Sequence, residues 1–302
     1  MNVKTSIADQ YLLEHFYETC SQAAKRCLHC SGVEGLSENY SWLDVLFYGD
    51  KKCGSCEFRM DGQGFYDGKG VFSRGFESQK YVSLNHIRTQ EEFESLCDKI
   101  NQDVQGIVIR GAVANAAPLE KFKKLEFVVL SDQKIEHFWD VSQNPCLRIL
   151  SIYGNHHLKS LKGLEKAESL ECIQFLSHIA SVNTVKVDSL APIAKLPKLK
   201  EVIISATEPL DHNMDYLIGL EALEYLWISP NLFPMECYAK FEAKKFMLSE
   251  EYGIYLEDEG DVFPYGKGKR VMHTKEQKEK YLREYNKLLE QYKHGDGYGL
   301  QA

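Results

Sequence analysis

The sequence has 302 residues, of which 44% are hydrophobic and 26% are charged, as in an ordinary globular protein of about two domains. Its formal net charge of −8 argues against binding of nucleic acid through phosphate contacts. No apolar run approaches the ~20 residues of a membrane-spanning helix, and Asp9 and Glu14 interrupt the stretch where a signal peptide would be apolar, so we expect a cytoplasmic protein.

The first predicted element is an amphipathic helix over residues 6–27. Ser6 and Asp9 have the spacing of a capping box. The stripe that follows has the steps of three and four of a helix with one buried face: Leu12, Phe16, Cys20, Ala24 and Cys27. Residues 40–83, rich in Tyr, Phe and Gly, predict short strands and turns, and residues 88–101 predict a second helix. Residues 1–101 are therefore expected to form an α+β cap.

Two CxxC pairs in this cap form a candidate metal site, whose ligands would be Cys27, Cys30, Cys53 and Cys56. Two such pairs match a closed, structural zinc site with four thiolates. Buried free thiols remain an alternative, because Cys27 also lies on the helical stripe, and disulfide or redox chemistry is a third. Most of the isolated cysteines are expected to pack in the core; these are Cys97, Cys146, Cys172 and Cys237.

One apolar pattern returns six times between residues 104 and 228. An apolar residue is followed by others three and five positions later, and successive units start 21 to 29 residues apart. The triplets are Val104-Ile107-Ile109, Leu125-Val128-Leu130, Leu147-Leu150-Ile152, Leu170-Ile173-Phe175, Leu199-Val202-Ile204 and Leu223-Leu226-Ile228. The last two residues of each triplet share one face of a short strand. A single unit cannot bury that face, so the units are expected to stack with their strands parallel.

This pattern resembles the leucine-rich repeat, L-x-x-L-x-L-x-x-N, in its short bacterial and SDS22-like class. At the Asn position the six units carry Ala112, Gln133, Asn155, His178, Thr207 and Asn231. Leucines three residues apart, such as Leu158, Leu161 and Leu164, predict short helical or 3₁₀ turns between the strands. The resemblance implies an α/β solenoid over residues 102–233, with about six parallel strands on its concave side and the turns on its convex side.

The other face of these strands carries few charges and many apolar and aromatic residues. Such a surface suits the binding of another protein. The predicted partner contacts are Phe127, Val129, Ile149, Tyr153, Gln174, Leu176, Glu201, Ile203, Tyr225 and Trp227. The alternative is that a terminal segment folds over this face and buries it. Residues 177–189 lengthen one unit, either as a projecting loop near the binding face or through neutral drift in length.

The C-terminal tail, residues 234–302, predicts two helices around an acidic stretch. The first spans residues 235–246, and the second begins at a Thr274–Gln277 capping box. The acidic stretch, residues 250–261, either neutralises the basic final helix or forms a charged docking surface. The run YGKGKR, residues 265–270, resembles a feature of some bacterial cytosolic leucine-rich-repeat proteins. Some members of that group are immunity proteins that accompany toxin genes.

The sequence contains no phosphate-binding loop and no GxSxG or HExxH motif, so we predict that the protein is not an enzyme. The favoured hypothesis is a protein-binding module, monomeric or in a 1:1 complex, that masks its partner sterically. Its sharpest form is an immunity protein that neutralises a bacterial toxin. The alternatives are a scaffold, and an enzyme or substrate-recruiting adaptor whose N-terminal module carries the chemistry.

Overall fold

The computed structural model describes residues 6–8, 10–11, 80–176, 185–205, 207–246, 248 and 263–294. The four candidate zinc ligands, Cys27, Cys30, Cys53 and Cys56, lie outside these residues. So do most of the predicted helix over residues 6–27 and the whole acidic stretch.

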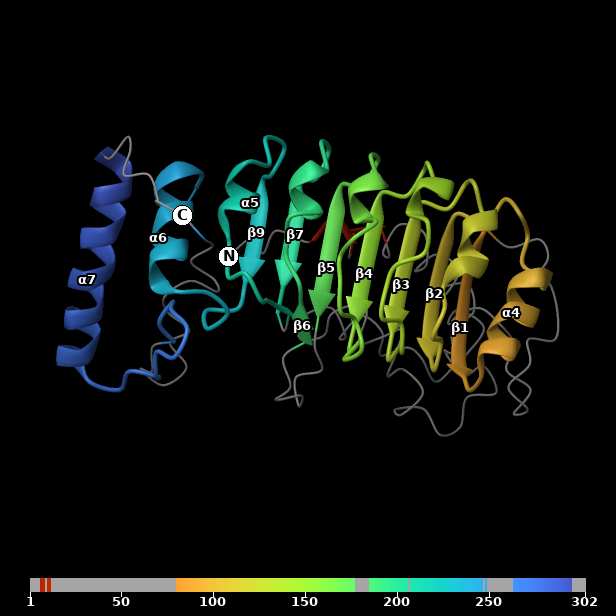
Figure 1. Ribbon diagram of the computed structural model, residues 1–302, viewed down its shortest axis with the longest axis horizontal. Coiled ribbons are helices and arrows are strands. Elements are labelled where there is room, and N and C mark those ends of the chain that lie inside the picture. Colours follow the sequence, from red (N-terminus) through yellow and green to blue (C-terminus); the bar gives the residue numbers. More distant parts are fainter. Residues whose placement is uncertain are drawn as a thin grey trace, which may run out of the picture.

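Within the described residues, seven parallel strands form one sheet that runs along the molecule (Figure 1). In spatial order the strands are β1 (Tyr81–Ile87), β2 (Gly106–Gly111), β3 (Phe127–Ser131), β4 (Ile149–Tyr153), β5 (Cys172–Leu176), β7 (Glu201–Ile204) and β9 (Tyr225–Ile228). Six of them are the strands of the six predicted repeats. The prediction of a leucine-rich-repeat solenoid is therefore confirmed.

The sheet begins one strand earlier than the repeat pattern indicated. β1 pairs in parallel with β2, and the helix α4 (Gln90–Lys99) connects the two. This helix confirms the prediction over residues 88–101, with Phe93, Leu96 and Cys97 buried and the Thr89 hydroxyl accepting a hydrogen bond from the Glu92 N–H. A boundary at residue 101 therefore cuts between two strands that are hydrogen-bonded to each other.

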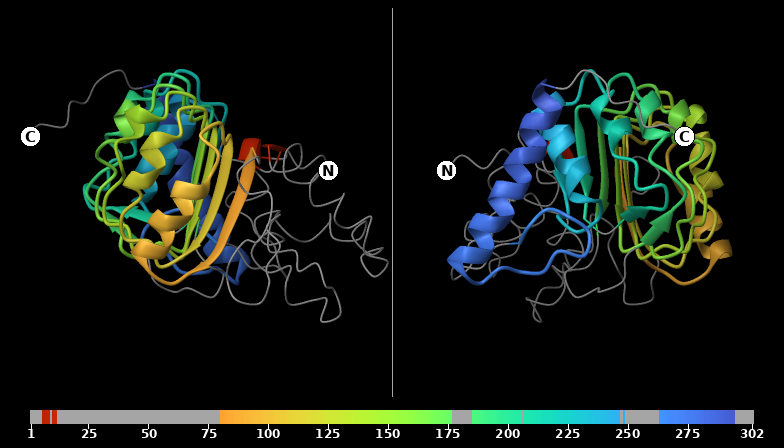
Figure 2. Two further views of the ribbon diagram at one scale, coloured as in Figure 1. Left: turned by 90° about the vertical axis from the view of Figure 1, so that its right-hand side faces the viewer. Right: turned by 60° about the vertical axis from the view of Figure 1, so that its left-hand side comes forward.

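Short helical turns cover the convex side of the sheet, as the period of three predicted (Figure 2). They are η4 (Ala117–Lys121), η5 (Val141–Gln143), η6 (Leu164–Lys166), η7 (Ile193–Lys195) and α5 (Asp215–Ile218), and neighbouring turns contact each other. The second and third residues of every triplet lie between the sheet and these turns in the main core. Each unit thus buries its apolar face against the next one.

Buried amides tie successive units together. The Asn155 side chain donates to the Ile135 carbonyl at 3.1 Å, as the repeat consensus requires. Gln133 replaces that Asn one unit earlier: its amide donates to the carbonyls of Ile109 and Ser131 and accepts from the Val113 N–H. On the convex side, Asn144 donates to the carbonyls of Leu119 and Phe122. Buried backbone groups between the units are thereby satisfied.

Part of the insertion forms a strand. Residues 177–184 lie outside the description, but β6 (Val185–Val187) pairs in parallel with β8 (Thr207–Pro209) to form a second, two-stranded sheet. These three residues therefore do not form a projecting loop, which was one of the two interpretations left open by the sequence.

Two helices close the end of the solenoid beyond β9: α6 (Met235–Lys244) and α7 (Lys275–His294) (Figure 1). The Thr274–Gln277 capping box is present, with each backbone N–H donating to the other side chain. Rings of Tyr238, Tyr265 and Tyr285 stack in sequence and join the two helices. None of the described helices is both long and apolar enough to cross a membrane.

Candidate partner-binding surface

The concave face is built from two rows of side chains that the strand register aligns. The first row is Gly106, Phe127, Ile149, Cys172, Glu201 and Tyr225, and the second is Val108, Val129, Ser151, Gln174, Ile203 and Trp227. Each residue in a row is the register partner of the next. The sequence pattern predicted this alignment correctly, because the same offset recurs in every repeat.

The half of this face on β2 to β5 is occupied. Residues 6–11, described except for residue 9, form a turn of helix in which the Gln10 N–H donates to the Ser6 carbonyl at 2.9 Å. Figure 2 shows this turn in red on the side of the sheet opposite the convex turns. Ala8 and Tyr11 are buried against Val108, Phe127, Val129, Ile149 and Cys172 in a second apolar cluster.

Tyr11 makes the most extensive ring contacts of this turn. Its ring stacks on that of Phe127, with centroids 5.1 Å apart and planes 13° from parallel. It also meets the edge of Tyr81 at 6.3 Å, and its hydroxyl donates to Glu126 at 3.4 Å. Burial, with the nearby Glu126 charge, raises the pKa of Tyr11 above its ordinary value.

Glu201 receives the first backbone N–H of the turn. The Ile7 N–H donates to Glu201 Oε2 at 2.9 Å, while the Cys172 thiol and the Gln174 amide donate to Oε1, each at 3.2 Å. Gln174 also lies 3.4 Å from Ser6 Oγ and accepts from the Ser151 hydroxyl. Only 4% of Glu201 is exposed, so these three donors replace the water that a carboxylate would otherwise bind.

Six of the ten predicted contact residues are therefore buried, and the expectation that they are exposed is wrong. They are Phe127, Val129, Ile149, Tyr153, Gln174 and Glu201. Residues 6–11 cover Phe127, Val129 and Ile149 and contact Gln174 and Glu201, which was the alternative left open by the sequence. Contact of a partner with these five residues requires that residues 6–11 move.

The half of the face on β7 and β9 is different. Ile203, Tyr225 and Trp227 are partly exposed, and so is Leu176 at the end of β5. Ile203 and Trp227 are register partners, and Tyr225 pairs with Glu201. This β7–β9 half therefore carries partly exposed Ile203, Tyr225 and Trp227, whereas Leu176 packs against the cluster that residues 6–11 cover.

A row of charges borders the concave face at the start of the strands. The residues that precede β3, β4, β5, β7 and β9 alternate in sign: Glu126, Arg148, Glu171, Lys200 and Glu224. Arg148 and Lys200 both contact Glu171, at 2.9 and 3.1 Å. These hydrogen bonds, led by that from Arg148, hold the pKa of Glu171 below its ordinary value. Both basic residues of this row are thus paired with Glu171, and the row as a whole carries one more acidic than basic residue.

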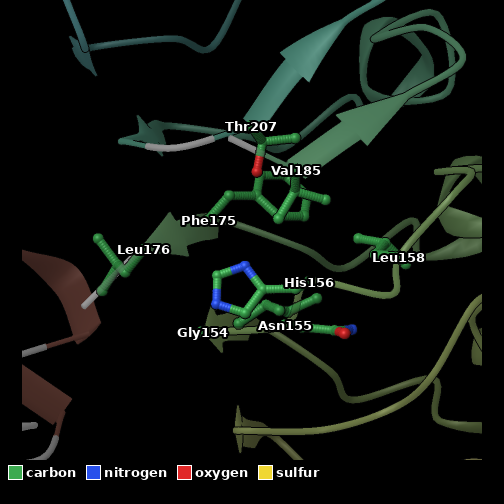
Figure 3. Close-up of a pocket in the computed structure, with 9 residues that line it drawn as sticks. Gly154, Asn155, His156, Leu158, Phe175, Leu176, Val185 and Thr207 are labelled. Carbon is green, nitrogen blue, oxygen red and sulfur yellow. The ribbon is translucent and has the colours of Figure 1, made fainter. Parts of the chain in front are cut away.

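A small pocket lies at the opposite edge of the sheet, beyond β4 and β5 (Figure 3). His156 points into it among Phe175, Leu176, Val185 and Thr207, and its cavity volume is about 10 Å³, room for about one water molecule. Ligand pockets are far larger, about 300–1,000 Å³. The pocket was not predicted from the sequence.

The described residues contain no group of three or more His, Cys, Asp or Glu side chains placed to hold a metal ion. The zinc hypothesis concerns cysteines outside them. Cys97 and Cys172 are buried as expected, and burial raises the pKa of Cys97 to about 12. Cys237 is partly exposed and Cys146 is exposed, so two of the four isolated cysteines are buried in the core.

No protein-family model and no curated protein matches the sequence. Solved leucine-rich-repeat structures do match. An internalin (InlF) from Listeria monocytogenes str. 4b F2365 has 17% identity and a TM-score of 0.41 over 56% of this chain and 47% of its own. An internalin C2 from the same strain has 15% identity and a TM-score of 0.41 over 53% and 66%. TLR13 in complex with ssRNA13 has 15% identity and a TM-score of 0.31 over 51% and 29%.

The chain thus spans less than two thirds of each of these proteins, and likeness at this level carries no function with it. Its fold stands on the strand order, the register and the repeated triplets. On these grounds the chain is a leucine-rich-repeat solenoid.

Proposed function

We propose that this chain is a protein-binding module that holds its partner with the β7–β9 half of its concave face. The observation behind the proposal is the set of partly exposed side chains Leu176, Ile203, Tyr225 and Trp227 on one side of a rigid parallel sheet. Trp and Tyr dominate binding energy at protein interfaces, because they bury a large area with few rotatable bonds.

The narrower proposal is a cytoplasmic immunity protein that masks a bacterial toxin. It is supported by the resemblance of the YGKGKR run and terminal helix to those of some bacterial leucine-rich-repeat proteins. In the structure this run is fixed to the solenoid: the Gly266 N–H donates to the Pro230 carbonyl at 2.7 Å and the Lys267 ammonium contacts Glu208 at 2.5 Å. Masking by a rigid surface needs no chemistry from the protein itself.

Affinity purification with the full chain as bait, from cells of the organism that encodes it, tests the proposal. A partner should be retained by the wild type and lost with Tyr225→Ala/Trp227→Ala. Leu210→Ala and Phe263→Ala are matched controls, since both remove an exposed large apolar side chain that belongs to neither row of the concave face. Equal recovery on all baits would contradict the proposal.

The proposed immunity role predicts two further properties of the captured protein. The captured protein should be toxic when expressed alone and harmless when expressed with this chain, and the two should elute as a 1:1 complex in gel filtration. Transient binding with turnover of the captured protein would instead favour the enzyme or adaptor alternative.

A further inference from the structure

The concave face is divided at Glu201. On one side of it, residues 6–11 cover β2 to β5, and on the other side Ile203, Tyr225 and Trp227 are partly exposed. The covering turn is far from these strands in sequence, so it contacts them as a separate peptide would.

The contacts of this turn are those of peptide recognition. Tyr11 supplies an aromatic anchor on Phe127, and Ala8 fits the apolar cluster. The Ile7 N–H gives Glu201 a donor, so the turn is held at both ends. Ile7 and Tyr11 lie four positions apart, about 6 Å along a helix, which sets the spacing between the carboxylate and the aromatic contact.

We propose that residues 6–11 are an intramolecular ligand of the concave face, which must leave when a partner spans the whole face. The displacing partner presents a helical segment of the same chemistry, with an N-terminal N–H or a basic group for Glu201 and an aromatic side chain for Phe127. The identity of the displacing segment rests on the proposed function, whereas the docking of residues 6–11 does not.

One feature makes the contact releasable. The polar contact of this turn depends on Glu201, and a partner with a suitable donor satisfies that carboxylate equally well. A segment of the same chain also has a high effective concentration, of the order of millimolar, so a competing segment must bind more tightly or add contacts elsewhere. The partly exposed Ile203, Tyr225 and Trp227 on β7 and β9 offer those additional contacts.

Alkylation of Cys172 measures the docking directly. This thiol is fully buried in the cluster that contains Ala8 and Tyr11, whereas Cys146 is exposed and serves as an internal reference. Iodoacetamide labelling of the full chain, read by peptide mass spectrometry, should modify Cys172 far more slowly than Cys146. Ala8→Asp/Tyr11→Ala, which places a charge in the apolar contact and removes the ring, should speed Cys172 labelling at least about tenfold.

The matched control is Gln10→Asp, which adds a charge to the exposed side of the same turn and should leave Cys172 protected. Tyr11→Phe, which keeps the stacked ring, should also preserve protection. Labelling of wild-type Cys172 as fast as Cys146, or no acceleration in the double variant, would overturn the proposal. Circular dichroism melting verifies that the double variant is folded.

Binding of a separate peptide is the second test of the proposal. A fluorescent peptide with the sequence of residues 1–18 should bind the Ala8→Asp/Tyr11→Ala chain at least about tenfold more tightly than the wild type, whose own turn competes. The same peptide with Tyr11→Ala should not bind. Failure of the peptide to bind the open variant would refute the ligand role. Because Cys172 protection involves neither Tyr225 nor Trp227, failure here is distinguishable from failure of the proposed function.

Discussion

The ring of Tyr11 lies stacked on the ring of Phe127 at 5.1 Å, joining the start of the chain to the second predicted repeat. The repeat pattern gives every strand the same concave-facing positions, but this contact covers those positions on some strands and not on others. Without it, the aromatic and aliphatic residues of β2 to β9 would form one continuous row. With it, residues on β2 to β5 are covered, whereas Ile203, Tyr225 and Trp227 on β7 and β9 are partly exposed.

Gly111→Ala should destabilise the fold strongly. Gly111 has a φ of +135°, and a Cβ there would lie 2.2 Å from the carbonyl oxygen of Ile87 in the neighbouring strand. We expect a loss of about 3 kcal/mol in the free energy of unfolding, because the clash adds to the strain of the backbone. Gly163→Ala is the matched control: its φ is +102° but no atom lies within 4 Å. Urea unfolding of both variants checks the difference, and equal losses would contradict the account.

Gln133→Ala should also cost stability, because it leaves buried backbone groups of Ile109, Ser131 and Val113 without the amide that bonds them. The expected loss is about 1–3 kcal/mol. Gln143→Ala removes a similar amide from an exposed site and should change the free energy of unfolding by less than about 0.5 kcal/mol. A Gln133→Ala variant as stable as Gln143→Ala would show that this side chain does not serve as the repeat asparagine.

Glu242 and Glu171 should respond to pH in opposite senses. Burial raises the pKa of Glu242, although the Tyr285 hydroxyl donates to it at 2.8 Å. Its contribution to stability is therefore full below the ordinary glutamate pKa and is lost as the pH rises through the folded value. Glu171, whose pKa is lowered by Arg148, contributes above its ordinary pKa and loses that contribution as the pH falls through the folded value.

Chemical denaturation of Glu242→Gln and Glu171→Gln between pH 3 and 7 tests these signs. Relative to the wild type, Glu242→Gln should gain stability as the pH rises from about 4.5, the ordinary value for the group. Glu171→Gln should lose stability relative to the wild type as the pH rises toward about 4.5, because the wild type regains the contribution of Glu171 in that range. Parallel curves for the wild type and both variants would refute the assignment.

The candidate zinc site is tested by metal analysis of the full chain purified without added zinc. The hypothesis predicts about one zinc per chain, and loss of that zinc in Cys53→Ser, because a four-thiolate site does not tolerate removal of a ligand. Cys146→Ser, at an exposed thiol, should keep the metal. A molar zinc content well below one per chain would contradict the hypothesis.

The repeated part of the fold could be predicted because its signal is periodic. Triplets such as Leu147-Leu150-Ile152 set both the strand and its register, since the same offset places Phe127 beside Ile149 and Ile149 beside Cys172. The capping box of α7 was visible for a similar reason, as it depends only on Thr274 and Gln277. Local and periodic features of this kind can be predicted from residue types and their spacing.

The remaining features depend on contacts between distant segments. β1 joins the sheet by pairing with β2, yet it lacks a complete triplet of its own. The docking of Tyr11 on Phe127 left no periodic signal, and only the unusual apolar character of the concave row hinted at a cover. The function of Gln133 as an asparagine substitute follows from its hydrogen bonds, which the residue type alone does not specify.

The central claim is that Tyr225 and Trp227 anchor a protein partner, and calorimetric titration of the captured partner against Trp227→Ala tests it most directly. The account predicts a dissociation constant about 30-fold weaker than that of the wild type, equivalent to about 2 kcal/mol at an interface anchor. Phe263→Ala should bind within about twofold of the wild type. A Trp227→Ala variant that binds as tightly as the wild type would contradict the account.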